Sequence, residues 1–246
     1  MNILVCVSKT PDTTAKVDFI GDAKKYNEEG KQFIMNPYDE WYALVRAMEL
    51  KESNGGEVTI INVGPASNDP ILRKGLAIGA DKAIRVDAED TDAFFVASQI
   101  AAYAVDNGFD LIFCGKETID YNGSLVGSMV AELLNQPFIS YASKMEYTDG
   151  TAIVNRDIEG GIEVLKLKTP FVLSAAKGLA EQRIPNMRGI MMAKRKPLDV
   201  IPAVDAGSGL SIEKFELPAD KGSVKMVDPN DMDELVRLLH EEAKII

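Results

Sequence analysis

Short apolar runs alternate with amphipathic segments over the first two-thirds of the chain. The apolar runs predict strands that are buried on both faces, and they occupy residues 3–7, 58–63, 83–86 and 111–114. Between the first two runs, Trp41, Leu44, Val45 and Met48 recur at helical spacing and predict one buried helix face. Strands that alternate with helices in this way predict an α/β fold with a doubly wound, mostly parallel, Rossmann-like sheet.

The ends of the predicted helices carry turn and capping residues. Asn36-Pro37 and Asp69-Pro70 each open a helix, and Asp90 or Thr91 caps a third that extends to residue 105. A fourth helix covers residues 125–134. In a doubly wound sheet, ligands bind beyond the carboxyl ends of the strands, where the strand order reverses. The segments after the strands are therefore the first place to look for a site.

The pattern changes from Tyr141 onward. Alternating residues predict an added antiparallel β segment, with strands at 144–147, 152–158 and 162–167, followed by an apolar strand at 171–175. Residues 184–196 form an irregular loop that passes into a short helix, and residues 198–217 lack periodicity and predict an extended arm. Asp228-Pro229 opens a final helix.

This organisation divides the chain into two parts. Residues 1–197 form an α/β nucleotide-binding type of domain, and residues 198–246 form an arm that ends in an amphipathic helix. A connector of about 20 residues without structure is uncommon inside a compact domain. We therefore expect the arm to clasp another subunit rather than fold back on its own domain.

Composition and charge narrow the function classes. The chain has 38 acidic and 27 basic side chains, a net charge of −11, which argues against nucleic acid as the main partner. No apolar stretch is long enough to insert in a membrane. Cys6 and Cys114 both lie inside apolar runs, which argues against a disulfide framework and indicates a reducing cytoplasm. The chain has a single histidine, His240, which argues against a metal site built from histidines and against a Ser-His-Asp triad.

The segment 115–124, between the fourth apolar strand and a helix, is the first candidate site. Its glycines allow close backbone approach, and the free N–H groups of a helix start attract an anion. Asp120 is placed to bond a ribose hydroxyl or an adenine amine, and Ser124 and Ser128 are placed to donate to phosphate. The alternative is a well-capped turn with Ser124 as the cap. Asn36 has the same two interpretations, an adenine contact or a helix cap, and on its own the cap is favoured.

The segment 183–196 is a second candidate, for protein docking. It holds five basic residues and no acidic one, and its apolar tip comprises Ile184, Pro185 and Met187. Such a loop suits an acidic protein partner, because charges steer association and the apolar tip supplies central burial. The alternative is a solvated basic turn. Arg156 lies in a run of alternating charges that is typical of a solvated strand face. The alternative is that Arg156 lies near a bound flavin or at a subunit contact, and the spacing does not decide between the two.

Taken together, these segments resemble the β subunit of electron transfer flavoprotein, over nearly the whole chain. The motifs that carry the resemblance include N-P-Y-D-E at 36–40 and D-L-I-F-C-G-K-E-T-I-D at 110–120. The most specific are R-D-I-E-G-G-I-E-V-L-K-L-K-T-P at 156–170 and R-I-P-N-M-R-G-I-M-M-A-K-R-K-P at 183–197. The resemblance implies an electron carrier subunit without a chemical step of its own.

The resemblance also implies partners and cofactors. Its members pair with an α subunit that holds the redox-active FAD, and their C-terminal arm wraps that subunit. The heterodimer shuttles electrons between flavoprotein dehydrogenases, such as acyl-CoA dehydrogenases, and a downstream acceptor. The β subunit itself holds a structural AMP in one branch and a second FAD in electron-bifurcating members, which oxidise NADH.

The resemblance transfers three sets of residues to this chain. The nucleotide pocket would comprise Cys6, Asn36, Pro37, Tyr38, Asp39, Val63, Ile119, Asp120, Tyr121, Asn122, Gly123, Ser124, Gly127 and Ser128. The docking loop would comprise Arg183, Ile184, Pro185, Met187, Arg188, Lys194 and Arg195, with Met187 as its anchor. Asp157, after Arg156, matches the acidic residue that releases the flavin domain for motion.

One departure from the family pattern bears on the cofactor. The family has T-G-Q-x-T where this chain has Val126, Gly127, Ser128, Met129 and Val130. Two threonine hydroxyls and a glutamine amide that would bind phosphate are therefore replaced. AMP, another ligand or none stays open for this subunit, and a simple shuttle is favoured over a bifurcating one. A nucleotide-binding sensor domain without redox function is the alternative from a different class.

Overall fold

The computed structural model describes residues 1–89, 92–207 and 209–246. Its strands are β1 Asn2–Cys6, β2 Lys9–Pro11, β3 Phe19–Ile20, β4 Lys25–Tyr26, β5 Phe33–Met35, β6 Glu57–Val63, β7 Lys82–Asp87, β8 Leu111–Gly115, β9 Phe138–Thr148, β10 Thr151–Ile158, β11 Gly161–Lys168, β12 Phe171–Ala175 and β13 Leu198–Pro202. Its helices are α1 Asp39–Asn54, α2 Asp69–Ile78, α3 Ala93–Asn107, α4 Val126–Leu133, α5 Met187–Ala193 and α6 Met232–Arg237, with short helical turns at Ala66–Asn68 and Leu238–Glu242.

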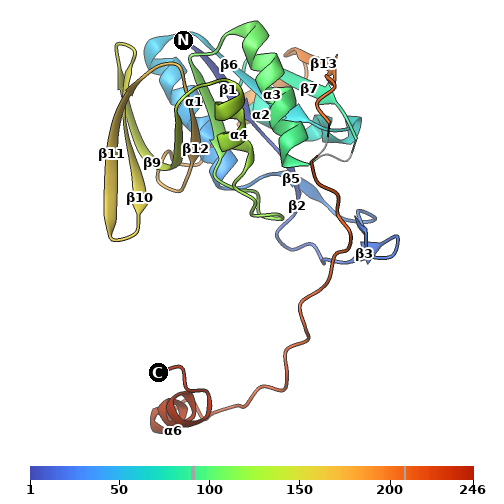
Figure 1. Cartoon of the computed structure of the whole chain (residues 1–246), viewed down its shortest axis with the longest axis vertical. Coiled ribbons are helices and arrows are strands. Elements are labelled where there is room, and N and C mark those ends of the chain that lie inside the picture. Colours follow the sequence, from blue (N-terminus) through green and yellow to red (C-terminus); the bar gives the residue numbers. More distant parts are fainter. Residues whose placement is uncertain (90–91, 208) are drawn as a thin grey trace. The chain divides into compact units, whose positions relative to one another are not determined.

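The predicted mixed, mostly parallel sheet is confirmed. Among the described residues the main sheet has nine strands in the order β11-β10-β9-β12-β8-β1-β6-β7-β13 (Figure 1). All pairings from β9 to β13 across this order are parallel, and β9, β10 and β11 pair antiparallel. Strand β9 starts at Phe138, earlier than its alternation indicated; its first residues pair in parallel with β12, and its antiparallel pairing with β10 runs from Ala142.

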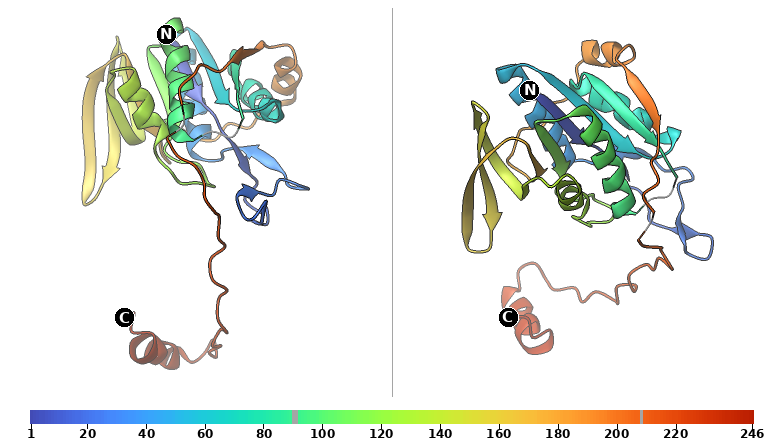
Figure 2. Two further views of the ribbon diagram at one scale, coloured as in Figure 1. Left: turned by 45° about the vertical axis from the view of Figure 1, so that its right-hand side comes forward. Right: turned by 45° about the horizontal axis from the view of Figure 1, so that its top comes forward.

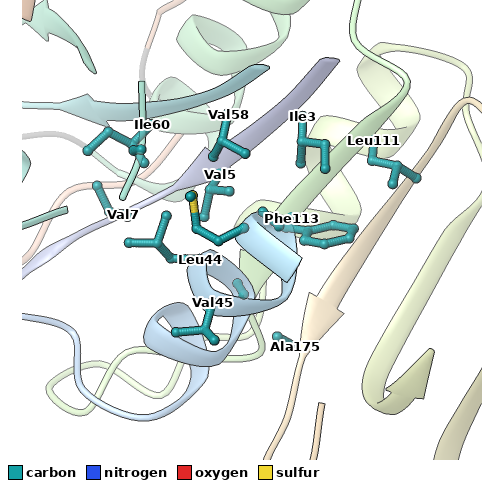
Figure 3. Close-up of a cluster of buried hydrophobic side chains, with 14 of the residues drawn as sticks. Ile3, Val5, Val7, Leu44, Val45, Val58, Ile60, Leu111, Phe113 and Ala175 are labelled. Carbon is teal, nitrogen blue, oxygen red and sulfur yellow. The ribbon is translucent and has the colours of Figure 1, made fainter. Parts of the chain in front are cut away.

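Helices cover both faces of the sheet (Figure 2). On one face, Leu44 of α1 lies toward Val5 of β1, as the close-up in Figure 3 shows, and Val45 and Ile3 belong to the same buried cluster. On the other face, side chains of α3 and α4 pack with Leu4 and its neighbours in β6 and β8. Burial on both faces explains why the central strands are continuous apolar runs.

Three helix starts differ from the sequence predictions. Helix α1 begins at Asp39, with Tyr38 rather than Asn36 at the N-cap position. Asp90 and Thr91 lie outside the described residues, and it is Asp92 that caps α3 by accepting the N–H of Phe95. Helix α6 begins at Met232, after its cap Asp231, rather than at 228–229. At α3 and α6, neighbouring aspartates compete for the cap, so composition alone does not select among them.

The extended arm predicted from residue 198 begins only after β13. Leu198–Pro202 pairs in parallel with β7 at the edge of the sheet. An edge strand has one exposed side, so it lacks the long apolar run of the central strands. The small pairings of β2 with β5 and of β3 with β4 were also not anticipated.

The chain divides into two compact units. The larger comprises Met1–Lys16 with Asn27–Glu213, and the smaller comprises Val17–Tyr26 with Lys214–Ile246. The larger unit contains the main sheet and both layers of buried apolar side chains. In the described ranges, none of the helices is both long and apolar enough to cross a membrane.

Candidate functional site

The strand order reverses between β1 and β8. From β1 the chain continues to β6 and β7 on one side, and it later returns to place β8 on the other side of β1. The segments that follow β1, β6 and β8 therefore leave the sheet at its carboxyl edge. This is the position at which open α/β sheets bind ligands.

Asn36 joins two of these segments through its side chain. Its Nδ2 donates to the Glu117 carbonyl oxygen at 3.0 Å, and its Oδ1 accepts the Ile119 N–H at 3.1 Å. The side chain is fully buried. Asn36 is thus neither the helix cap that was favoured nor an exposed adenine reader. It fixes the loop after β8 to the start of α1.

Glu40 makes a second connection beneath the same edge. Its carboxylate accepts the Ser8 N–H at 2.7 Å, and the Ser8 hydroxyl donates to its other oxygen. Burial raises the pKa of Glu40 to about 8, and the Ser8 hydrogen bonds oppose that rise only in part. A Cβ on Gly115 would lie 2.8 Å from Cγ of Glu40, so the end of β8 must be glycine to let α1 approach this closely. The role of this glycine is helix packing rather than access for phosphate.

A cavity of about 400 Å³ opens beside these connections. Five of the residues predicted for the nucleotide pocket line it: Pro37, Tyr38, Asp39, Ile119 and Asn122. Its remaining lining comes from the predicted flavin-motion residue Asp157 and from residues that the sequence did not single out: Tyr42, Lys116, Glu117, Tyr141, Ala176 and Lys177. The structure thus brings the α1 start, the loop after β8 and β10 to one hollow.

The cavity has strained aromatic walls and mixed charge. Tyr38 and Tyr141 adopt positive φ angles of 66° and 58°, a conformation that is uncommon for aromatic residues and that concentrates at functional sites. Burial raises the pKa of Asp39 to about 6, against the opposing charge of Lys116. Lys116 pairs with Glu117 at 2.8 Å and lies over the Tyr141 ring. The hollow therefore suits a polar ligand with a flat ring.

The other residues predicted for the nucleotide pocket lie outside this cavity. Cys6 and Val63 end β1 and β6, and Cys6 is buried beside Cys114, whose hydrogen bond raises the pKa of the Cys6 thiol. Gly127 is buried against Phe138, and the Ser128 hydroxyl donates to the Leu125 carbonyl at 2.8 Å. Asp120, Tyr121, Gly123 and Ser124 lie on the exposed stretch of the loop, on either side of the cavity residue Asn122. Ser124 is not the cap of α4, because Leu125 occupies that position without a side-chain hydrogen bond.

Comparison with known proteins decides the family. A model of the electron transfer flavoprotein domain matches residues 24–206. The electron transfer flavoprotein β subunit of Bacillus subtilis is 36% identical, with each chain covered in full. Those of Bradyrhizobium diazoefficiens and Mus musculus are 33% and 32% identical, over all of this chain and at least 99% of theirs. The chain belongs to the electron transfer flavoprotein β-subunit family. Its role is therefore in electron transfer, as part of a flavoprotein.

In this electron transfer flavoprotein subunit, Arg156 and Asp157 point to opposite faces of β10, as adjacent strand residues must. Arg156 donates to Glu163 at 2.5 Å and to Ser140 at 2.8 Å. Asp157 is exposed, lies near the Ser143 hydroxyl and lines the cavity. Only Asp157 of this pair is thus positioned on the hollow at the carboxyl edge.

The predicted docking loop forms an exposed patch around α5. Ile184 and Met187 are 83% and 74% exposed, and Met191 is exposed beside them. Asn186 caps the helix by accepting the N–H of Gly189. Arg188, Lys194 and Arg195 are exposed, whereas Pro185 is half-buried. Arg183 is engaged with Glu52 at 2.6 Å, and Lys196 donates to carbonyls at the end of α2, so these two cations have structural roles.

Sequence reasoning missed several residues of the site. Glu40 was quoted in a motif without a role, and Lys116, Glu117 and Tyr141 were not singled out. The available signal for Glu40 was its spacing from Leu44 and Ala47, which puts it on the buried face of α1. No such signal places Tyr141 at the cavity, because the direction of its side chain depends on a positive φ angle within β9.

Proposed function

We propose that this chain is the β subunit of a heterodimeric electron transfer flavoprotein in the cytoplasm. It pairs with an α subunit that holds the redox FAD, and the complex carries electrons between flavoprotein dehydrogenases, such as acyl-CoA dehydrogenases, and a downstream acceptor. The observation that carries the proposal is full-length similarity to β subunits of this flavoprotein. The flavin supplies the redox chemistry when bound, and this chain helps to bind, orient and shield that flavin.

The nucleotide site of this subunit is proposed at the carboxyl edge, around the loop after β8. Helix α4 has no side-chain cap, so the N–H groups of its first turn are available to a phosphate. Val130, which replaces a family threonine, is fully buried among apolar side chains and so cannot contact a phosphate. Backbone groups would therefore carry the phosphate contacts, which favours the single phosphate of AMP over the pyrophosphate of a second FAD.

Cofactor counting tests this proposal. The chain is co-expressed with the α subunit from the same genome, and the nucleotides of the purified complex are released and quantified. One FAD per heterodimer, with or without AMP, is the expected result. Two FAD molecules would replace the simple shuttle with a bifurcating subunit that oxidises NADH. If the chain does not pair with the α subunit and purifies without flavin, as a monomer or a self-associated oligomer, the non-redox sensor would be favoured instead.

Met187→Ala tests the docking assignment. Met187 is 74% exposed and lies in the chain between the exposed Ile184 and Met191, so its loss should remove much of the buried contact with a dehydrogenase. We expect the apparent KM for the partner dehydrogenase to rise about tenfold, with unchanged flavin content. Steady-state electron transfer with varied dehydrogenase measures it. Val105→Ala, at an exposed position of α3, is the matched control. An unchanged KM, or a loss of flavin, would remove Met187 from the docking surface.

A further inference from the structure

The chain beyond Glu213 is fastened to a hairpin from the N-terminal half. The hairpin is Val17–Tyr26, in which β3 and β4 flank a turn of left-handed residues. The Phe215 ring stacks on Phe19, with centroids 4.9 Å apart and planes within 8°. The Phe215 N–H also donates to the Ala23 carbonyl at 2.7 Å. We refer to this paired contact as the Phe19–Phe215 latch.

Side chains outside the arm also form hydrogen bonds with its backbone at positions before Phe215. Gln99 of α3 donates to the Val204 carbonyl at 2.8 Å and accepts the Val204 N–H at 2.7 Å. Asp92 accepts the N–H groups of Gly209 and Leu210 at 2.7 and 2.9 Å. A flexible linker would not need such side-chain contacts. The path of the arm is therefore specified by residues outside it.

Beyond the latch, apolar side chains are exposed. Val224 and Met226 are 78% and 85% exposed, and Leu217 is also exposed. In α6, the exposed side includes Met232 and Val236. Single exposed apolar residues need no explanation, but a succession of them within one segment marks an interaction surface. Some of the charged residues nearby pair with one another, as Arg237 does with Glu234 and Glu241.

We propose that the Phe19–Phe215 latch presents the segment after it to the flavin-carrying α subunit, which buries those apolar side chains. The inference rests on the proposed function. Helix α6 continues directly into the helical turn Leu238–Glu242, and the two together are still too short to be stable alone, so packing on a partner must supply their stability. Fixing the start of the segment lowers the entropy lost on binding and keeps the apolar residues near the partner. Phe19 is thus a positioning residue for assembly, although it lies far from the arm in the sequence.

A double-mutant cycle tests the latch. Phe19→Ala, Phe215→Ala and the double variant are compared in affinity for the purified α subunit, with Phe94→Ala, an exposed phenylalanine of α3, as the control. Each single variant should bind about tenfold more weakly, and the double variant should be little weaker than either. Phe215→Tyr keeps the ring and should restore affinity. Additive losses, or single variants that bind like the unmodified chain, would overturn the latch.

Hydrogen exchange of the isolated chain separates the latch from the proposed function. The Phe215 amide should be protected, and Phe19→Ala should abolish that protection while leaving amides in β1 unchanged. Protection that survives in Phe19→Ala would overturn the latch. If the unmodified chain fails to bind the α subunit, the proposed function fails, whatever the exchange shows. If the chain instead forms dimers that depend on Phe215, a second copy occupies the surface and the commitment to the α subunit is wrong.

Discussion

Deletion of Lys214–Ile246 should abolish the heterodimer and leave the main sheet folded. The larger compact unit keeps all nine strands of that sheet and both buried apolar layers, because its residues end at Glu213. The deleted part carries the exposed apolar residues Val224 and Met226 and the whole of α6. Loss of several such side chains from one interface should weaken α-subunit binding by more than about 100-fold.

The position of the cut matters for this experiment. A deletion from residue 198 would remove β13, which pairs with β7, and would expose that strand's edge. Its effect on assembly would then be mixed with damage to the sheet. The measurement is co-purification with a tagged α subunit, with circular dichroism of the truncated chain as the control for folding. A truncated chain that is folded and still pairs normally would show that the arm is not the clasp.

The parts that sequence patterns predicted well are those with one dominant physical cause. Residues 3–7 and 171–175 are apolar because both faces of a central strand are covered, and they form β1 and β12 with almost the predicted bounds. The buried face of α1 follows from the spacing of Leu44, Val45 and Met48 in the same way. Gly55 ends α1 as expected, with a positive φ angle.

The parts that sequence patterns missed depend on contacts distant along the chain. The role of Asn36 comes from Glu117 and Ile119, more than 80 residues away, and no local pattern distinguishes it from a helix cap. The sequence around Phe215 has no pattern that distinguishes it from the rest of the irregular arm, and only the structure shows its ring stacked on Phe19. The motif resemblance located the neighbourhood of the site, but only the positive φ angles at Tyr38 and Tyr141 assign those two side chains to its walls.

Glu40→Gln should make the protein more stable than the unmodified chain in alkaline solution. Glu40 is fully enclosed, and the charged groups that act on it, Asp39 and Asp120, are both acidic. The thiol of Cys6 is also within its field, and the hydrogen bonds from Ser8 are its only opposing influence of note among the described residues. The enclosed carboxyl therefore prefers its neutral form.

The sign of the pH dependence follows from the raised pKa of about 8, against an ordinary value of 4.5. Below the ordinary value, both folded and unfolded chains hold the proton, and the contribution to stability is complete. Between the two values the unfolded chain loses the proton while the folded chain keeps it, so stability falls as pH rises. Once pH has passed the folded value the loss is complete, of the order of 5 kcal/mol.

Glutamine has the same shape and no charge to lose, so the variant should escape this fall. Denaturant unfolding at about pH 5 and about pH 9 measures the free energy of unfolding of both chains, with Glu29→Gln at an exposed position as the control. The unmodified chain should lose several kcal/mol more than Glu40→Gln, and Glu29→Gln should follow the unmodified chain. Parallel pH profiles for the unmodified chain and Glu40→Gln would mean that Glu40 is ionised in the folded protein at neutral pH. Its contacts with Ser8 would then offset the cost of burying the charge, and the stability contributed by the connection from α1 to the end of β1 would not change with pH.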